Sequence, residues 1–373
     1  MIEEAGARIV GFLTNQIGGT FLSPSSTLSF QCLAVSLAVA VVLLLRNRRS
    51  SRPLRLRAAW RALFPKRMFG TRSGRLDAAF FVLSTAGIGA LFGWAIVSAE
   101  WVRLGAGALF GHGAPLVGLT PVVASAIVTV SLYIAYEFAY WFDHWIKHRS
   151  AVLWAFHKVH HDAESLSILT NFRVHPVDTI IFYNLIALTT GVTAFGLEVV
   201  LGREAGVVSI GTTNILIMVM AAGLTHLQHS HFWMGAGLRG WLLGPAHHQI
   251  HHSADPAHHN RNLGSSLALW DRVFGTYYAP TATRPALRFG SGAAVEHRLG
   301  EALWRPFMEA RAIVFERKTR ASGLPVQASG LPVRASGHPV RGSGRRYAAS
   351  MSARGSKPSV LISSGRSGPS LGA

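Results

Sequence analysis

Histidines are the residues of this chain whose number and spacing point most directly to chemistry. Of 18 histidines, 15 lie between residues 144 and 259. A neutral imidazole is a common metal ligand, and side chains three or four residues apart on a helix point the same way. Three groups have this spacing: His144 and His148; His157, His160 and His161; His248, His251 and His252.

Several helices of this kind that converge supply eight or more imidazole nitrogens. One zinc ion needs only four ligands in a structural site, or three and a water in a catalytic site, so two metal ions are the simpler interpretation. The single cysteine, Cys32, excludes iron–sulfur clusters and copper–thiolate sites. Iron, zinc and copper all accept imidazole ligands, and ligand type alone leaves the choice among them open.

The composition is typical of a membrane protein, with 49% hydrophobic and 14% charged residues and a mean hydropathy of +0.29. The net charge of +19 is concentrated in two segments. Residues 46–75 carry eleven Lys and Arg and no acid, and residues 317–373 carry ten and no acid. We therefore interpret the basic residues as a loop beside the membrane and a tail, and we expect no nucleic-acid partner.

Five stretches without charged residues are each about long enough to cross ~30 Å of hydrocarbon as a helix. They are 27–45, 78–99, 113–136, 179–197 and 205–225. The sequence thus predicts an all-α, multi-pass integral membrane protein with four to five transmembrane helices, the last two forming a hairpin. The positive-inside rule places the basic loop in the cytosol, and alternation then brings nearly all histidines to the cytosolic face. A helical cytosolic cap would hold the two metals.

Three regions follow from these patterns. Residues 1–75 are predicted to hold the first transmembrane helix and the basic cytosolic loop, and residues 76–316 the metal-binding membrane domain, with an amphipathic helix over 294–315. Residues 317–373 are rich in Ser, Gly and Pro and contain an imperfect seven-residue repeat, so we predict a disordered basic tail.

The three histidine groups, in this order between apolar helices, resemble the fatty acid hydroxylase/sterol desaturase superfamily of membrane di-iron oxygenases. The Arg173-x-His175-Pro element, the His229-Ser element and the run from Asn262 to Tyr277 are also similar to that superfamily. The resemblance covers about residues 80–280. His231 stands where the family often has Asn, and the gap in His144-x3-His148 fits hydroxylases and sterol-type enzymes better than acyl-CoA desaturases.

The resemblance implies a di-iron centre, which zinc can replace in purified protein. It implies that the ligands are His144, His148, His157, His160, His161, His175, His229, His248, His251 and His252. Asp143, Asp162, Asp178 and Asp271 are candidates to orient imidazole rings. The roles of His226, His231, His247, His258 and His259 stay open, and no catalytic residue other than the ligands is assigned.

The activity implied by the resemblance is oxygen-dependent hydroxylation or desaturation of a lipid, either a fatty acyl chain, a sterol or a related apolar substrate. The sequence contains no flavin or dinucleotide glycine motif and no cytochrome b5-like domain. A separate ferredoxin, rubredoxin or cytochrome-type electron donor is therefore expected, besides molecular oxygen.

Two alternative functions use the same residue types. A zinc-dependent membrane hydrolase needs fewer histidines and usually an H-E-x-x-H motif, which is absent. A metal transport protein without enzymatic activity needs ionisable residues deep inside the spans, where only Glu137 is found.

Overall fold

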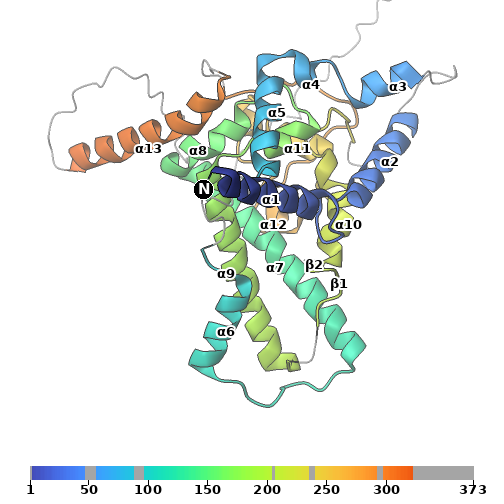
Figure 1. The fold of residues 1–373 in the computed structure, drawn as a ribbon, viewed down its shortest axis with the longest axis vertical. Helices are drawn as coiled ribbons and strands as arrows, with labels where there is room; N and C mark the ends of the chain where they lie inside the picture. The colour runs from blue at the N-terminus through green and yellow to red at the C-terminus, as the bar shows by residue number, and fades with distance from the viewer. Residues whose placement is uncertain are drawn as a thin grey trace, which may run out of the picture. The chain divides into compact units, whose positions relative to one another are not determined.

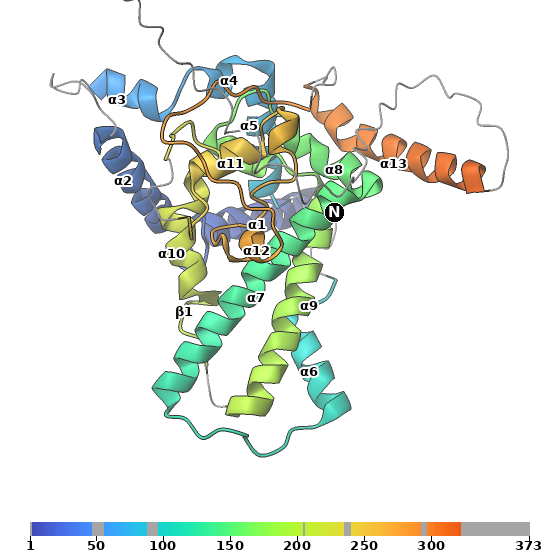
Figure 2. The same ribbon diagram turned by 180° about the vertical axis from the view of Figure 1, so that it is seen from behind.

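The computed structural model describes residues 2–46, 56–87, 96–203, 206–234, 240–291 and 297–321, all within one compact unit. These residues are mostly helical (Figures 1 and 2). The elements are α1 (Ile2–Phe21), α2 (Phe30–Arg46), α3 (Leu56–Leu63), α4 (Arg67–Gly70), α5 (Arg72–Thr85), α6 (Ala99–Phe110), α7 (Pro121–Arg149), α8 (Ala151–His161), the 3-10 helix η2 (Ile168–Phe172), α9 (Pro176–Leu201), the short antiparallel pair β1 (Ser209–Ile210) and β2 (Thr213–Asn214), α10 (Ile215–Gly223), η3 (Thr225–Leu227), α11 (Pro245–His251), η4 (Pro256–His258), α12 (Leu269–Val273) and α13 (Leu299–Ala321).

Two long helices, α7 and α9, run side by side, and α6 packs along α9 (Figure 1). Helix α7 begins with Pro121 and helix α9 with Pro176. At the first position of a helix the missing N–H of proline costs nothing, because that N–H would have no partner within the helix. Helix α7 ends before Ser150, whose side chain accepts a hydrogen bond from the Leu153 N–H and so begins α8. The 29 residues of α7 and the 26 of α9 exceed the ~20 needed to cross a bilayer.

The apolar surfaces of these helices are left uncovered by the rest of the protein. On α9, Leu188 and Val192 are 51% and 54% exposed, and on α7 Val122 and Val130 are also exposed. Contiguous apolar surface of this extent on two long helices is stable when hydrocarbon covers it. Among the described residues, α7 and α9 are the two candidate membrane spans, and they indicate a membrane protein.

The other predicted spans differ from the helices that form. Of the stretch 205–225, residues 209–214 form the β-hairpin, and only nine residues are helical in α10. The stretch 78–99 is divided, because α5 ends at Thr85, Gly87 has a φ of 70°, and α6 starts after Ser98. Helix α2, with 17 residues, and α10 are apolar but short. A total of four or five spans therefore stays a prediction.

The boundaries predicted for the three regions fall inside helices. The boundary at 75/76 lies in α5, and the boundary at 316/317 lies in α13, which begins at Leu299 and extends to Ala321. Residues 322–373, most of the predicted disordered tail, lie outside the described residues, as do residues 47–55 of the basic loop. Helix α1 was not predicted from the sequence.

The polar region after residue 240 is held against α7 by a buried carboxylate. Glu137, in the middle of α7, accepts hydrogen bonds from the backbone N–H groups of Ser266 and Leu267 at 3.1 and 3.0 Å. The Ser266 hydroxyl donates to the same carboxylate. The following helix α12 packs on α7 (Figure 2). Glu137 thus fixes the segment that leads to α12, which explains how an acid is tolerated in an apolar helix.

We expect Glu137→Ala to lower the free energy of unfolding by about 3 kcal/mol, since it leaves two buried N–H groups without an acceptor. Thermal unfolding of the detergent-purified protein measures this change. Glu100→Ala, which removes an exposed carboxylate on α6, should leave the melting temperature nearly unchanged. Equal melting temperatures for both variants would contradict the role given to Glu137.

Candidate metal centre

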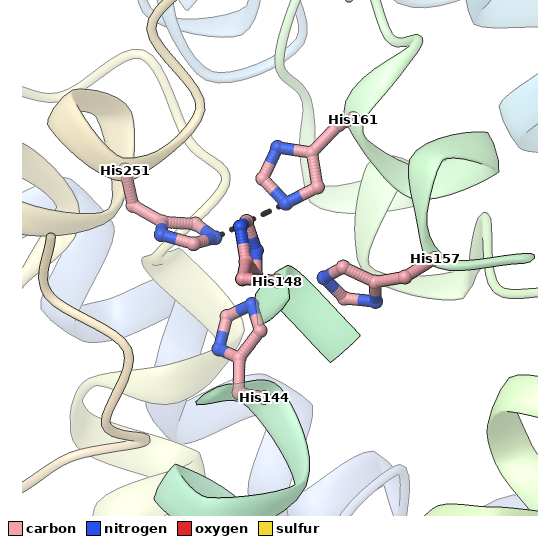
Figure 3. A group of neighbouring side chains, drawn as sticks. All are labelled: His144, His148, His157, His161 and His251. Atoms are coloured by element: carbon pink, nitrogen blue, oxygen red, sulfur yellow. Dashed lines mark hydrogen bonds between the residues drawn. The ribbon is translucent and has the colours of Figure 1, made fainter. Parts of the chain in front are cut away.

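Nine of the ten histidines predicted as ligands lie in two compact groups. The potential ligand atoms within each group all lie within 4.8 Å of one another. The first, called the five-histidine group, consists of His144, His148, His157, His161 and His251. The second, called the four-histidine group, consists of His160, His229, His248 and His252. Figure 3 shows the rings of the five-histidine group pointing toward a common point.

Both H-x2-H-H motifs contribute to both groups. On α8, His157 and His161 belong to the five-histidine group, whereas His160 belongs to the other. The last motif has the opposite arrangement, because His248 and His252 lie in the four-histidine group and His251 in the first. Residues four apart share a helix face, and the third histidine points about 100° away from one of them. The expectation that each motif points to one spot is therefore wrong.

The four-histidine group has a geometry that hydrogen bonding alone cannot satisfy. The Nε2 atoms of His229, His248 and His252 form a triangle, with separations of 2.9, 3.2 and 3.2 Å. An imidazole nitrogen is either a donor or an acceptor, so at least one of the three contacts joins two donors or two acceptors. A shared cation resolves this conflict, because four nitrogens ~2.0 Å from one metal lie about 3.3 Å apart in a tetrahedron.

In the five-histidine group, too, hydrogen bonds leave imidazole nitrogens unsatisfied. The Nε2 atoms of His144, His148 and His157 are buried and have no hydrogen-bond partner. The Nε2 atoms of His161 and His251 are 3.1 Å apart. Buried polar atoms without partners are rare and costly. A metal ion held by these nitrogens removes that cost, so the residues of both groups fit a metal.

Backbone carbonyls orient several of the rings from behind. The Nδ1 atom of His144 lies 2.8 Å from the Leu263 carbonyl oxygen, and that of His251 lies 2.9 Å from the Arg261 carbonyl oxygen. The Nδ1 atom of His160 lies farther from its partner, 3.3 Å from the Arg173 carbonyl oxygen. An Nδ1–H that donates to a carbonyl leaves the lone pair on Nε2, which is the tautomer a metal requires.

His157 is oriented by a carboxylate instead, as the sequence suggested for the aspartates. Asp178, in the first turn of α9, accepts from His157 Nδ1 at 2.8 Å and also pairs with the Lys147 ammonium. Lys147 is buried and contacts Asp143 at 2.5 Å. The sequence reasoning missed this lysine, although its position four residues after Asp143 on a helix is a sign of an ion pair. Its charge compensates two buried carboxylates beside the metal groups.

The other two predicted aspartates, Asp271 and Asp162, form hydrogen bonds with groups other than imidazoles. Asp271 accepts hydrogen bonds from the N–H groups of Leu263 and Gly264, both at 2.8 Å. It therefore holds the segment whose carbonyl orients His144. Asp162 accepts from the Ser291 hydroxyl, and among the described residues no hydrogen bond joins it to a histidine.

His175 does not lie in either group. It is the N-cap residue of α9, where its Nδ1 accepts a hydrogen bond from the Val177 N–H at 3.1 Å. Its Nε2 lies 2.9 Å from the Leu303 carbonyl oxygen on α13. With both nitrogens engaged by backbone groups, His175 fastens the start of α9 to α13, and its position does not support the prediction that it is a ligand.

Five histidines were left without a predicted role. All five lie outside both groups: His226, His231, His247, His258 and His259. His226 Nε2 lies 2.7 Å from the Thr27 carbonyl oxygen. His247 accepts from the Gly244 N–H at 3.2 Å, within the first turn of α11. These contacts give both rings local structural partners.

Burial keeps most imidazoles of the centre neutral at physiological pH. It lowers the pKa of His229 and of His251 to about 3, from the ordinary value of 6.5. It also lowers the pKa of His160, His161, His248 and His252 well below that value, and neighbouring imidazoles add to the effect. Neutral nitrogens are the form that binds a metal.

The fold and the two histidine groups define a helical membrane protein with a candidate histidine-ligated dimetal centre. Residues 129–276, which hold all nine grouped histidines, match the model of the fatty acid hydroxylase family. This match and the curated relatives support an assignment to the fatty acid hydroxylase superfamily, which the sequence motifs predicted.

Curated relatives support the same assignment. The chain is 26% identical over 192 residues to an alkylglycerol monooxygenase of Danio rerio, covering 48% of this chain and 38% of that protein. It is 29% identical over 153 residues to the ornithine lipid hydroxylase OlsE of Rhizobium tropici, covering 41% and 42%. The alkylglycerol monooxygenase of Xenopus tropicalis is 24% identical, over 39% of this chain and 29% of that protein. The chain thus spans less than half the length of these relatives, and no solved structure matches it.

Single substitutions should remove the metals separately. We expect His148→Ala and His252→Ala each to lower the metal content from about two ions per chain to about one, because each removes a ligand of a different group. Inductively coupled plasma mass spectrometry on anaerobically purified protein measures this. His175→Asn, which keeps an N-cap side chain, should retain both ions. Loss of metal in His175→Asn, or full content in both alanine variants, would contradict the two-group assignment.

Acid should destabilise the metal-free fold. Unfolded histidines take up protons below about pH 6.5, whereas His229 and His251 stay neutral in the folded state down to about pH 3. The unfolded state then binds more protons, so stability falls as the pH is lowered through this window. Melting temperatures of the chelator-treated protein between pH 7.5 and 4.5 test this. His112→Gln, at an exposed histidine, should show the same decline. A melting temperature that stays constant or rises would refute the burial of neutral imidazoles.

Proposed function

We propose that the protein is a lipid hydroxylase that uses two iron ions, one in each histidine group, and molecular oxygen to hydroxylate an aliphatic C–H bond. The single observation that supports this most strongly is the pair of adjacent histidine groups inside the region matched by the fatty acid hydroxylase family. The curated relatives are an alkylglycerol monooxygenase and an ornithine lipid hydroxylase, which favours hydroxylation over desaturation.

Iron is proposed because its redox chemistry, when it is bound, supplies the activation of oxygen that zinc cannot supply. The overall reaction joins R–H, O2, two electrons and two protons to give R–OH and water. The electrons would come from a separate donor of ferredoxin, rubredoxin or cytochrome type. The protein's own residues hold the ions, keep water away through the burial of nearly all nine rings, and position the substrate.

An apolar cavity of about 320 Å³ provides a place for the hydrocarbon chain of a lipid. Its volume lies in the range of pockets that bind small molecules, ~300–1,000 Å³. Side chains of α2, α4, η2 and the segment after η3 line it, among them Leu37, Ala40, Met68 and Phe172. The lining is almost wholly apolar, so the cavity favours an aliphatic occupant.

The few polar side chains in the lining are already engaged within the protein. The Ser36 hydroxyl lies 2.8 Å from the Ala222 carbonyl oxygen, and His226 lies against the Thr27 carbonyl. The Ser230 hydroxyl accepts from the Phe232 N–H at 3.4 Å. A polar ligand would therefore find few hydrogen-bond partners in the cavity. Burying its polar groups there would cost free energy, so the cavity favours an apolar ligand.

The lining of the cavity includes residues that flank the four-histidine group in the sequence. Leu227, Ser230 and His231, the neighbours of His229 in the sequence, all line it. Ser167 and Leu169, which follow α8 and its His160 in the sequence, also line it. We infer that a carbon of the bound chain is presented to the four-histidine side of the centre. We also propose, from the positive-inside rule, that the centre lies on the cytosolic face.

Oxygen isotope labelling tests the proposed reaction. Membranes that contain the protein, an iron supply and a reductase system are incubated under 18O2, and extracted lipids are analysed by mass spectrometry. We expect one 18O atom in a lipid alcohol, and no product with His252→Ala. Cleaved lipids without 18O would favour the hydrolase alternative. Metal uptake into vesicles with no lipid product would favour the transport alternative.

Filling the cavity should reduce product without removing metal. We expect Ala40→Phe, at a buried position of the lining, to lower lipid hydroxylation at least about tenfold by blocking the chain. Val42→Phe is the matched control, because Val42 lies on the same helix but is 52% exposed. Unchanged product in Ala40→Phe at normal metal content would reject the cavity as the substrate site while leaving the metal assignment intact.

A further inference from the structure

Helix α13 has two apolar faces, of which only one is covered by protein. On the covered face, Ala310 packs with Ala155 and Phe156 of α8, and Leu303 packs against the cluster around Leu76 of α5. On the other face, Trp304 is 65% exposed and Met308 is 41% exposed. Positions 304, 307, 308 and 314 are exposed on this side of the helix and are called here the α13 stripe. Phe307 lies at its edge, because its ring also contacts Phe156 and His175.

The position of α13 in the fold places this stripe where both membrane spans end. Helix α13 packs on α8, which begins two residues after α7 ends at Arg149. It also contacts the start of α9, because His175 binds the Leu303 carbonyl and Val177 packs beside Ala310. The last residue of α7 and the first of α9 lie near one surface of the bilayer if both helices span it. Helix α13 is therefore held at that surface.

The charges of α13 suit an anionic surface. Its 23 residues carry five Lys and Arg and three Glu, and four of the five basic residues follow Ala310. Arg311 is exposed and lies between Met308 and Val314 along the stripe. Apolar side chains with a tryptophan on one face and basic residues beside it are typical of helices that lie in the headgroup region.

We propose that the α13 stripe docks on the anionic surface of the lipid bilayer, with α13 lying in the plane of the interface. This helix follows the region matched by the family model, which ends at residue 276, so the proposal concerns a part of the chain that the family match does not cover. Docking holds α8 and the start of α9, and with them several histidines of the metal centre, at a fixed depth relative to the bilayer. It does not depend on the identity of the metal or on the proposed reaction.

The test is a depth measurement on the full-length protein in lipid nanodiscs. Cys32, the single cysteine, is replaced by Ser, and an environment-sensitive NBD label is attached at Trp304→Cys, Met308→Cys or, as a control on the polar flank, Arg305→Cys. Quenching by nitroxide lipids reports contact with the bilayer, and quenching by iodide reports contact with water. Metal content confirms that each variant is folded.

We expect labels at 304 and 308 to be quenched severalfold more by nitroxide lipid than the label at 305, with the reverse order for iodide. The difference should shrink when phosphatidylglycerol is replaced by phosphatidylcholine, and in Arg311→Gln, since the basic residues then lose their partners. Equal iodide quenching at all three positions would overturn the proposal. Labels at 304 and 308 that are protected from both quenchers would also overturn it, because protein would then cover the stripe.

Discussion

The structure depends on the packing of nine imidazoles, nearly all of them buried, around two points. Each ring that enters the centre loses its hydration, and the nitrogens that face one another have no satisfactory hydrogen-bond pattern among themselves. A cation at each point converts this unfavourable arrangement into a favourable one. The helices that carry the ligands are therefore coupled, because α7, α8 and α11 each place histidines that are satisfied only when the others are in position.

A set of buried polar contacts keeps those helices in register. Glu137 and Asp271 accept from backbone N–H groups in the segment between α11 and α12, so residues 263–267 of that segment are held in place. Its Leu263 carbonyl then meets His144 across the core. On the opposite side, Asp178 joins α9 to His157, and Lys147 neutralises the carboxylates of Asp178 and Asp143. Because each of these groups is buried, each is costly unless all its partners are present, and this cost favours a single arrangement.

The apolar parts of the molecule lie around this polar centre. Helices α7 and α9 expose apolar side chains along lengths that suit a bilayer, and the cavity has an almost wholly apolar lining. The centre itself lies at the end of α7 and the start of α9 rather than in the middle of either span. In the proposed function, a lipid whose chain occupies the cavity would stay in the membrane while one of its carbons meets the buried histidine groups.

The sequence by itself predicted nine of the ten candidate ligands that the structure brings together, because the clustering of histidines along the chain is a local property. It also determined the membrane class and two of the helices that are long enough to cross, since length and apolarity are local properties. The sequence did not predict helix α1. It also did not predict the division of the stretch 78–99, because a stretch without charged residues looks like one span even where a glycine with positive φ interrupts the helix.

Only the tertiary structure decided how the ligands divide into five and four. That division depends on the rotation of α8 and α11 relative to α7, which separates His160 from His161 and His251 from His252. It also placed His175 outside both histidine groups, where its ring contacts the carbonyl of Leu303, 128 residues away in the sequence. Contacts between segments so far apart leave no periodic pattern in the sequence, so they are fixed by packing alone.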